Sequence, residues 1–200
     1  MLPRRGAPSM RDEAAAPLGT SPDALLLARV AAGELRAFED LYQQYHPRLS
    51  RFIGNIVRRP HLVLEVLNDT MMVVWSKPQS YNGQSKVSTW IFAIAYRKSL
   101  KAMKRQDEPV EDPLADLRPS PDAGPDRRLE DVQVHEALMG ALNQLSADHR
   151  AVVDLTYFHG MGYREIAEIV DCPVDTVKTR MFHARRRLKT LLSGRLVDWL

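Results

Sequence analysis

Hydrophobic residues recur every three or four positions along most of the chain, which is the spacing that buries one face of a helix. The first such stretch runs from Asp23 to Ile56, and Gly33 divides it into two predicted helices. Pro60 ends this stretch, and the pattern resumes as a third predicted helix over 62–75. The first part of the chain is therefore predicted to be helical.

A polar segment interrupts the pattern after the third helix. Residues 78–88 contain a proline and an Asn-Gly pair, and they predict a loop. A fourth helix is expected from about Thr89 to Arg105, with Ser88 or Thr89 as its N-cap.

The segment 106–128 breaks the helical pattern. It holds five prolines among acidic residues, a composition that predicts a flexible linker. We therefore expect a disordered leader over 1–21, a first domain over 22–105, an acidic Pro-rich linker over 106–131 and a second domain over 132–200.

Helical periodicity returns in the second domain, and no segment of the chain has the alternation of a convincing strand. Helices are predicted near 129–145, over 147–158 with Ser146 as N-cap, over 163–170, and from Asp175 to about Leu192.

Composition limits the location and the chemistry of the protein. No run of about 18 apolar residues occurs, and the first twenty residues lack the apolar core of a secretory signal. No membrane insertion is therefore expected, and the protein is predicted to be cytoplasmic. The single cysteine, Cys172, excludes an internal disulfide and is interpreted as a packed turn residue rather than a redox sensor. The histidines are scattered and no phosphate-binding loop or nucleophile elbow occurs, so no metal, cofactor or enzymatic activity is expected.

The charges are segregated along the chain. Residues 22–105 carry 13 basic and 6 acidic side chains, 106–131 carry 3 basic and 9 acidic, and 132–200 carry 9 basic and 8 acidic. Two basic or locally basic blocks, separated by an acidic strip, suggest a polyanion that is contacted at two places.

Residues 162–189 carry the most specific pattern. Ile166, Ala167 and Val170 form a short apolar face, and 171–173 then break the helix. The next helix places apolar residues at intervals of four, three and four, which predicts one buried seam: Val177, Met181, Ala184 and Leu188. The predicted fold class is therefore all-α, with two small helical domains joined by a flexible linker, the C-terminal one a helix-turn-helix.

The seam determines the outward face of the second helix, for which Asp175 is interpreted as the N-cap. Between Asp175 and Lys189 there are six basic residues and one acid. Hydroxyls and cations on such a face suit the base edges and phosphates of a major groove. The candidate DNA-binding residues are Thr176, Lys178, Thr179, Arg180, His183, Arg186 and Arg187. The simpler alternative is a helical hairpin with a solvated basic face, and His183 is either a base contact or a surface residue.

The helix that begins near Trp90 carries a second basic face. Its apolar side holds Trp90, Ile91, Ile94 and Ala95, and Lys98 and Arg105 support its basic side. With the polar loop before it, which also holds Tyr81, this helix could hold an unpaired strand by stacking and phosphate contacts. The candidate residues are Asn82, Gln84, Ser85, Lys86, Trp90, Arg97, Lys101 and Lys104. Trp90 is alternatively a core residue.

The second domain resembles a known family. Segments 141–160, 163–169 and 174–180 are similar to the fourth conserved region of extracytoplasmic-function sigma factors. The resemblance implies that this domain reads the promoter −35 element and docks on the β flap of RNA polymerase. Asp171 stands where a turn glycine is usual, and aspartate tolerates a left-handed backbone better than most residues.

The first domain resembles the second conserved region of the same family, through 38–49, 65–75 and the helix of Trp90. The resemblance implies that this helix recognises the −10 element and that the loop before it captures a flipped base. It also implies that Glu65, Asn68 and Asp69 face the β′ clamp. Four residues depart from the usual pattern: Leu62 and Leu64 stand where acids are frequent, and Arg97 and Lys101 replace Asn and Asp.

The resulting hypothesis is a sigma factor whose partners are core RNA polymerase (β′ clamp and β flap) and promoter DNA. An anti-sigma factor is a candidate partner, because such proteins are frequent in this family. The alternative is a stand-alone helix-turn-helix regulator with an N-terminal sensing or dimerisation domain. The acidic linker is either a connector that runs through the polymerase channel or a solvated tether.

Overall fold

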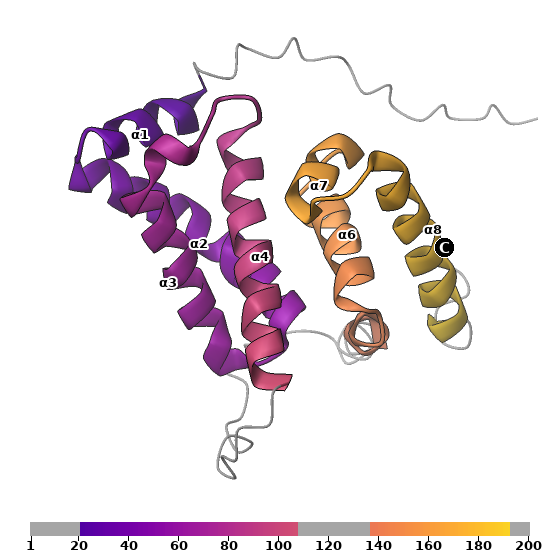
Figure 1. Cartoon of the computed structure of the whole chain (residues 1–200). Coiled ribbons are helices and arrows are strands. Elements are labelled where there is room, and N and C mark those ends of the chain that lie inside the picture. The colour runs from indigo at the N-terminus through magenta and orange to yellow at the C-terminus, as the bar shows by residue number, and fades with distance from the viewer. Residues whose placement is uncertain (1–20, 108–136, 193–200) are drawn as a thin grey trace, which may run out of the picture.

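The computed structural model describes residues 21–107 and 137–192, and all regular structure within these ranges is helical. The helices form two groups, which confirms the predicted class of two small all-α domains (Figure 1). The predicted leader up to residue 20 and the linker over 108–131 lie outside the described residues, as do 132–136 and 193–200.

The first domain contains α1 (Pro22–Ala31), α2 (Leu35–Val57), α3 (Pro60–Ser76), the 3-10 turn η2 (Pro78–Ser80) and α4 (Val87–Asp107). Ser21 caps α1, because its Oγ accepts the backbone N–H of Ala24 at 3.2 Å. Gly33 separates α1 from α2 with φ of 85°, a left-handed conformation that glycine adopts without strain.

Two predicted helix starts in this domain were wrong. The third helix was predicted to begin at residue 62, after Pro60, but Pro60 is itself the first residue of α3, where its fixed φ and missing N–H suit a helix start. The fourth helix begins at Val87, so Ser88 and Thr89 lie in its first turn and neither is the N-cap. Val87 is buried in the core, and its packing extends the helix towards the N-terminus, so that the helix begins before Ser88 and Thr89, the polar residues that would usually cap it.

The core of the first domain is formed mainly by α2, whose apolar residues face α3 and α4. Tyr45, Phe52 and Phe92 are among its largest fully buried side chains. The pKa of Tyr45 is raised far above its usual value, first by burial and then by the hydrogen bond that its hydroxyl donates to Asp23. This bond joins α1 to α2 below the outer surface.

The second domain contains helical residues 137–143, α6 (Ala147–Tyr157), α7 (Tyr163–Val170) and α8 (Val174–Leu192). Ser146 caps α6 as predicted, because its Oγ accepts the backbone N–H of His149 at 3.3 Å. Asp171 ends α7 with φ of 51°, the left-handed conformation that the turn requires. The N-cap prediction for Asp175 was wrong: α8 starts at Val174, and Asp175 lies in its first turn, paired with Lys178.

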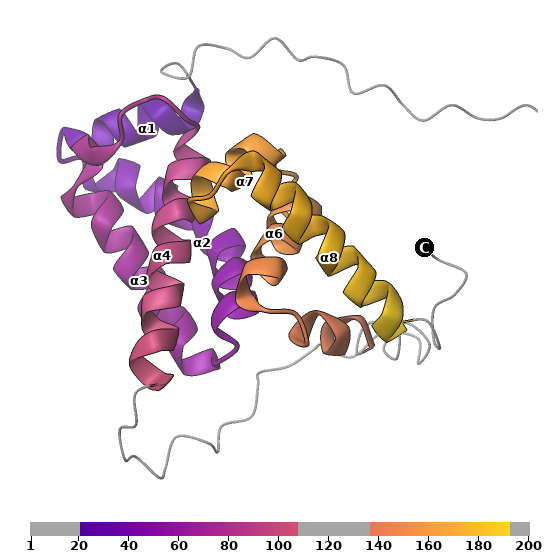
Figure 2. The same ribbon diagram turned by 45° about the vertical axis from the view of Figure 1, so that its right-hand side comes forward.

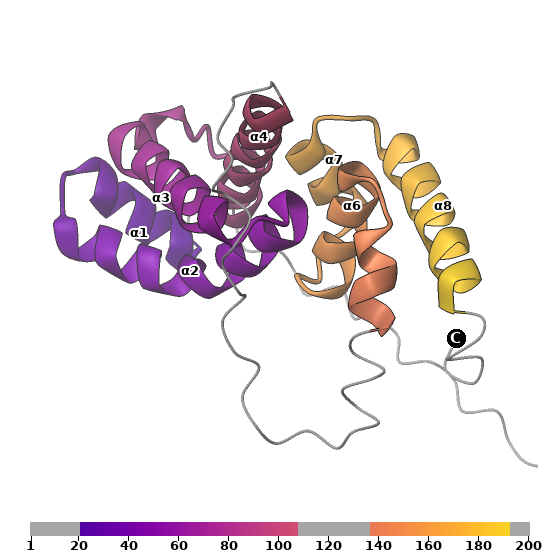
Figure 3. The ribbon, with the colours of Figure 1, turned by 90° about the horizontal axis from the view of Figure 1, so that it is seen from below.

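The two domains pack against each other, with α7 against α4 and α6 against α2 (Figure 2). The third view shows α6 and α7 between α8 and the helices of the first domain (Figure 3). One side of α8 is therefore turned away from the rest of the molecule. Within the described ranges, no helix combines the length and apolar character needed to cross a bilayer.

Candidate nucleic-acid interface

The α7–turn–α8 unit has the predicted helix-turn-helix geometry. Val177, Met181 and Ala184 are at most 2% exposed, and Leu188 packs beside them as a half-buried residue. Ile166 and Ala167 of α7 are also buried. The predicted seam is therefore confirmed, and it fixes which side of α8 faces outward.

Most of the candidate residues on α8 lie on this outward side. Thr176 is half-buried, whereas five others are exposed: Lys178, Thr179, His183, Arg186 and Arg187. Thr179 Oγ1 donates to the carbonyl of Asp175 at 2.9 Å, which leaves the hydroxyl oxygen able to accept a further bond. The exposed set combines hydroxyl, imidazole and guanidinium groups along one helix face, as major-groove readout requires.

Arg180 differs from its neighbours because it is engaged within the protein. Its side chain is 24% exposed and forms an ion pair with Asp148 of α6. Tyr96 of α4 donates its hydroxyl to the other oxygen of the same carboxylate at 2.7 Å. Burial first, and then this hydrogen bond, raise the pKa of Tyr96. Asp148 therefore connects α4, α6 and α8.

His183 lies beside a second histidine, with its ring centroid 6.4 Å from that of His149. Burial lowers the pKa of His149, and the neighbouring His183 and Arg180 lower it further. His149 Nδ1 is 2.7 Å from Ser146 Oγ at the start of α6. His149 is therefore mainly neutral at pH 7, while the exposed His183 is available for contacts outside the molecule.

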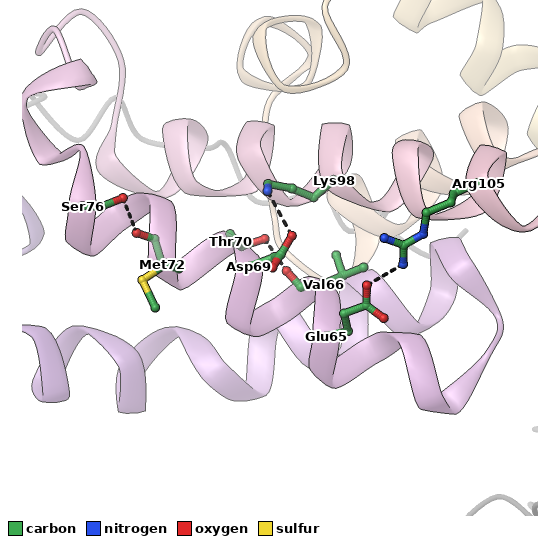
Figure 4. A network of polar contacts seen from close by, with 8 residues as sticks. All are labelled: Glu65, Val66, Asp69, Thr70, Met72, Ser76, Lys98 and Arg105. Carbon is green, nitrogen blue, oxygen red and sulfur yellow. Dashed lines mark hydrogen bonds and ion pairs between the residues drawn. The ribbon is translucent and has the colours of Figure 1, made fainter.

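The basic face of α4 is exposed where the sequence predicted it. Arg97, Lys101 and Lys104 are all exposed. Their neighbours Lys98 and Arg105 turn instead towards α3, where Lys98 pairs with Asp69 at 3.0 Å and Arg105 pairs with Glu65 (Figure 4). These two pairs hold α4 against α3 and leave the other three cations on the outer side.

The loop before α4 has a defined shape. The Tyr81 hydroxyl donates to the carbonyl of Ser85 at 2.6 Å, and its ring lies 5.6 Å from that of Trp90. Asn82 Oδ1 accepts the backbone N–H of Gln84 at 3.0 Å, and both side chains are exposed. Trp90 is half-buried, so it packs against the core and still offers part of its ring at the surface.

Lys86 in this loop is engaged by the second domain. Its Nζ lies 2.9 Å from Glu165 of α7, although its side chain remains 63% exposed. Glu165 also accepts the backbone N–H of Gly162 at 3.0 Å, which places its carboxylate at the start of α7. One candidate residue from each basic face, Lys86 and Arg180, is thus paired with an acid of the second domain.

The three residues proposed to face the polymerase lie on the exposed side of α3, each with a partner inside the domain. Asn68 accepts the Tyr42 hydroxyl at 3.2 Å, and Glu65 and Asp69 carry the ion pairs with α4 (Figure 4). Two apolar side chains of α3, Leu64 and Met72, are 57% and 62% exposed on the same helix. Their exposure was not predicted, because the helical period alone does not say which apolar residues of a helix stay outside the core.

A buried contact between the domains was also not predicted. His159, after α6, inserts its ring beside Phe52 and Phe92, at centroid distances of 6.0 and 4.7 Å. Its Nε2 lies 3.1 Å from Asp154 Oδ2, with both side chains 2% exposed. Asp154 Oδ1 accepts a hydrogen bond from Asn55 of α2. No sequence signal links residues so far apart along the chain.

Comparison with known families assigns both domains. Residues 41–108 match the family described as Sigma-70 region 2, and residues 135–188 match Sigma-70, region 4. The matches cover the loop–α4 surface and the helix-turn-helix, in the same order as their region numbers. The chain belongs to the sigma-70 family, as an extracytoplasmic-function sigma factor. The resemblance found in the sequence is therefore confirmed.

Several relatives match this sigma factor over most of their length. An ECF RNA polymerase sigma-E factor of Haemophilus influenzae is 27% identical and covers 84% of this chain and 93% of its own. The ECF RNA polymerase sigma factor SigM of Mycobacterium tuberculosis is 29% identical and covers 85% of this chain and 84% of its own.

Two solved structures share the fold. RpoE of Bartonella quintana, in complex with the anti-sigma factor NepR, has a TM-score of 0.62 with 26% identity, and covers 78% of this chain and 99% of its own. CnrH, in complex with the cytosolic domain of CnrY, has a TM-score of 0.65 with 22% identity, and covers 86% of this chain and 98% of its own.

Two exposed residues of α8 extend the candidate surface of this sigma factor beyond the predicted set. Phe182 is 62% exposed, and its ring lies 5.5 Å from that of His183. Arg185 donates through Nε to the Tyr157 hydroxyl at 3.1 Å. Phe182 is a large apolar residue that lies outside the apolar seam of a basic helix. This position could have identified it from the sequence as an exposed candidate contact. The described ranges contain no cluster of three or more potential metal-ligating His, Cys, Asp or Glu residues.

Proposed function

We propose that this sigma factor directs core RNA polymerase to promoters by placing its second domain on the −35 element and its first domain on the −10 element. The observation that carries the proposal is the pair of separate, exposed basic faces, one on each matched region. We also propose the division into a first domain over 22–105 and a second over 132–200. Acting on polymerase and DNA, the protein would work in the cytoplasm and would not itself be an enzyme.

On the −35 element, α8 would enter the major groove. Thr179, Arg180 and His183 lie towards its N-terminal half, where a recognition helix contacts base edges. Arg186 and Arg187 lie further along, where they would pair with phosphates. Phe182 would add an apolar contact, such as the one that suits a thymine methyl group.

On the −10 element, the loop before α4 would hold an unpaired strand. The Tyr81 and Trp90 rings supply stacking surfaces, and Asn82 and Gln84 supply amide groups beside them. Arg97, Lys101 and Lys104 would hold the phosphates along α4. The replacement of a usual Asn and Asp by Arg97 and Lys101 strengthens this phosphate contact.

On the polymerase, we propose that the exposed side of α3 contacts the β′ clamp and that the second domain contacts the β flap. An anti-sigma factor is a further proposed partner, because the related RpoE of Bartonella quintana is bound to one, NepR. The acidic side chains of α3 supply the polar part of the clamp surface, and Leu64 and Met72 supply an apolar part.

The clamp surface can be tested by replacing Glu65 with alanine. The Glu65–Arg105 pair is exposed, so the free energy of unfolding should change by less than about 1 kcal/mol. Affinity for core polymerase should fall about tenfold, because a charged group of the interface is lost. Fluorescence anisotropy of labelled protein titrated with core polymerase measures this. Glu39→Ala removes a similarly exposed ion pair on α2 and should leave the affinity unchanged.

The function is tested by transcription from a promoter library with purified core polymerase, with and without this protein. We expect transcripts from a defined class of promoters only when the protein is present, with two shared sequence elements upstream of their start sites. The stand-alone regulator instead requires tight binding to a duplex site without polymerase, and it predicts no new transcripts in this assay.

A further inference from the structure

A small cavity at the junction of the two domains is lined mainly by arginines. It has a volume of about 320 Å³ and lies where α2 ends. The residues that line it are Val57, Arg58, Arg59, Met103 and Arg150. Arg58 and Arg59 come from the first domain and Arg150 from α6 of the second, and none of the described residues that line the cavity is acidic.

Arg150 is the unusual member of this cluster. It is only 4% exposed, and its Nε and Nη1 have no hydrogen-bond acceptor among the described residues. Two buried guanidinium nitrogens without acceptors are unfavourable, because the hydration that they lose is not replaced. Burial, together with the charge of Arg58, lowers the pKa of Arg150 to about 10. The group nevertheless stays protonated at neutral pH, so the cavity contains an uncompensated cation.

Arg58 is held in position beside it. Its backbone is left-handed, with φ of 57°, and its N–H donates to the carbonyl of Gly54 at 3.0 Å. Its Nη1 donates to the carbonyl of Asn143 in the second domain at 2.9 Å. The two positive groups therefore approach each other although they repel, and no described side chain neutralises them.

We propose that this cavity is a binding site for a small oxyanion of the phosphate class, held by Arg58 and Arg150. Planar guanidinium groups donate pairs of hydrogen bonds whose spacing matches phosphate oxygens. A phosphate group near pH 7 carries between one and two negative charges and several acceptor oxygens, which suits two neighbouring guanidinium groups better than a single carboxylate does. The ligand would also supply the acceptors that Nε and Nη1 of Arg150 lack.

Because the arginines come from both domains, the bound anion would join them. It would stabilise the arrangement in which Tyr96 is bonded to Asp148 and Lys86 is paired with Glu165. The anion site does not depend on the proposed function. Only an effect of the bound anion on transcription would depend on it.

Thermal unfolding of the full-length protein in inorganic phosphate tests the site, with sodium chloride of equal ionic strength as reference. At about 100 times Kd, phosphate should raise Tm by about 5 to 10 °C, and the rise should saturate. Phosphate also stabilises proteins generally by exclusion from their surface, so the comparison that matters is between variants.

Arg150→Met is the deciding variant. Removing a buried, unpaired charge should leave Tm in chloride equal to or above that of the unchanged protein, while the saturable response to phosphate disappears. Arg36→Met removes an arginine near the start of α2, about 30 Å along the helix from the cavity, and should keep the response. An equal saturable rise in all three proteins, or none in the unchanged protein, would overturn the proposal.

A second variant covers the case in which Arg150→Met does not fold. Arg58 is exposed, so Arg58→Gln should fold and should bind inorganic phosphate at least about tenfold more weakly in calorimetric titration. Hydrogen exchange should show that phosphate protects the amides of 57–59 and of α6 together. Unchanged affinity of Arg58→Gln, or protection of only one of these two segments, would refute a ligand held between the domains.

Discussion

Replacing Arg180 with glutamate is expected to abolish transcription that depends on the −35 element. Arg180 lies at the edge of the outward face of α8, partly exposed and paired with Asp148, next to the exposed Thr179 and His183. Loss of one specific guanidinium contact costs about 1–3 kcal/mol, and a carboxylate in the same place repels the phosphates as well. We expect initiation to fall at least about 100-fold in a purified transcription assay, with the helical circular dichroism unchanged.

The matched control is Asp148→Ala, which removes the acid that Arg180 contacts in this structure. If Arg180 reads DNA, this change frees the guanidinium, and transcription should be at least as strong as with the unchanged protein. If Arg180 only holds α8 to α6, both changes should reduce transcription equally. That second result would falsify the recognition role of Arg180.

The ion pairs that Arg180 and Lys86 form within the protein affect how the proposed function could work. Each is a candidate DNA contact, and each is bound to an acid of the second domain. Under the proposed function the two promoter elements are separated along DNA, so the two domains would have to move apart to contact both of them. Separation breaks the Lys86–Glu165 pair and the Tyr96–Asp148 bond, whereas the Arg180–Asp148 pair lies within the second domain and is exchanged only when Arg180 contacts DNA. The closed arrangement therefore competes with DNA binding by the first domain.

The helix-turn-helix could be predicted from the sequence because its signals are local. Val177, Met181 and Ala184 repeat at helical spacing, and Asp171 and Pro173 mark the turn between the helices. Helix starts were less predictable, since Ser88 and Asp175 both have the chemistry of an N-cap and neither occupies that position. Tertiary packing of Val87 decided the first boundary. At the second, α8 begins at Val174, one residue before Asp175.

The interface between the domains could not be predicted in the same way. His159, Phe52 and Phe92 are separated by tens of residues, and each looks like an ordinary member of its own segment. Arg150 similarly reads as one more basic residue on an amphipathic helix until its burial is known. A polar group at a domain interface leaves no periodic signal in a single sequence, whether or not it has a hydrogen-bond partner in the other domain.

The largest loss of stability is expected for Phe92→Ala. Phe92 is fully buried in α4, with Phe52 at 5.2 Å and His159 at 4.7 Å between ring centroids, and with the Arg48 guanidinium 5.4 Å from its ring. Truncation removes a contact in the core of the first domain and the surface on which the second domain rests. We expect the free energy of unfolding, measured by urea denaturation, to fall by about 3–5 kcal/mol.

Phe182→Ala is the control for this loss, because it removes the same side chain from an exposed position of α8. Its free energy of unfolding should stay within about 0.5 kcal/mol of the unchanged protein. The two variants separate the two uses of phenylalanine in this protein: Phe92 should matter for folding and for contact between the domains, and Phe182 only for DNA binding. A loss below about 1 kcal/mol for Phe92→Ala would mean that the domains do not rest on this ring in solution.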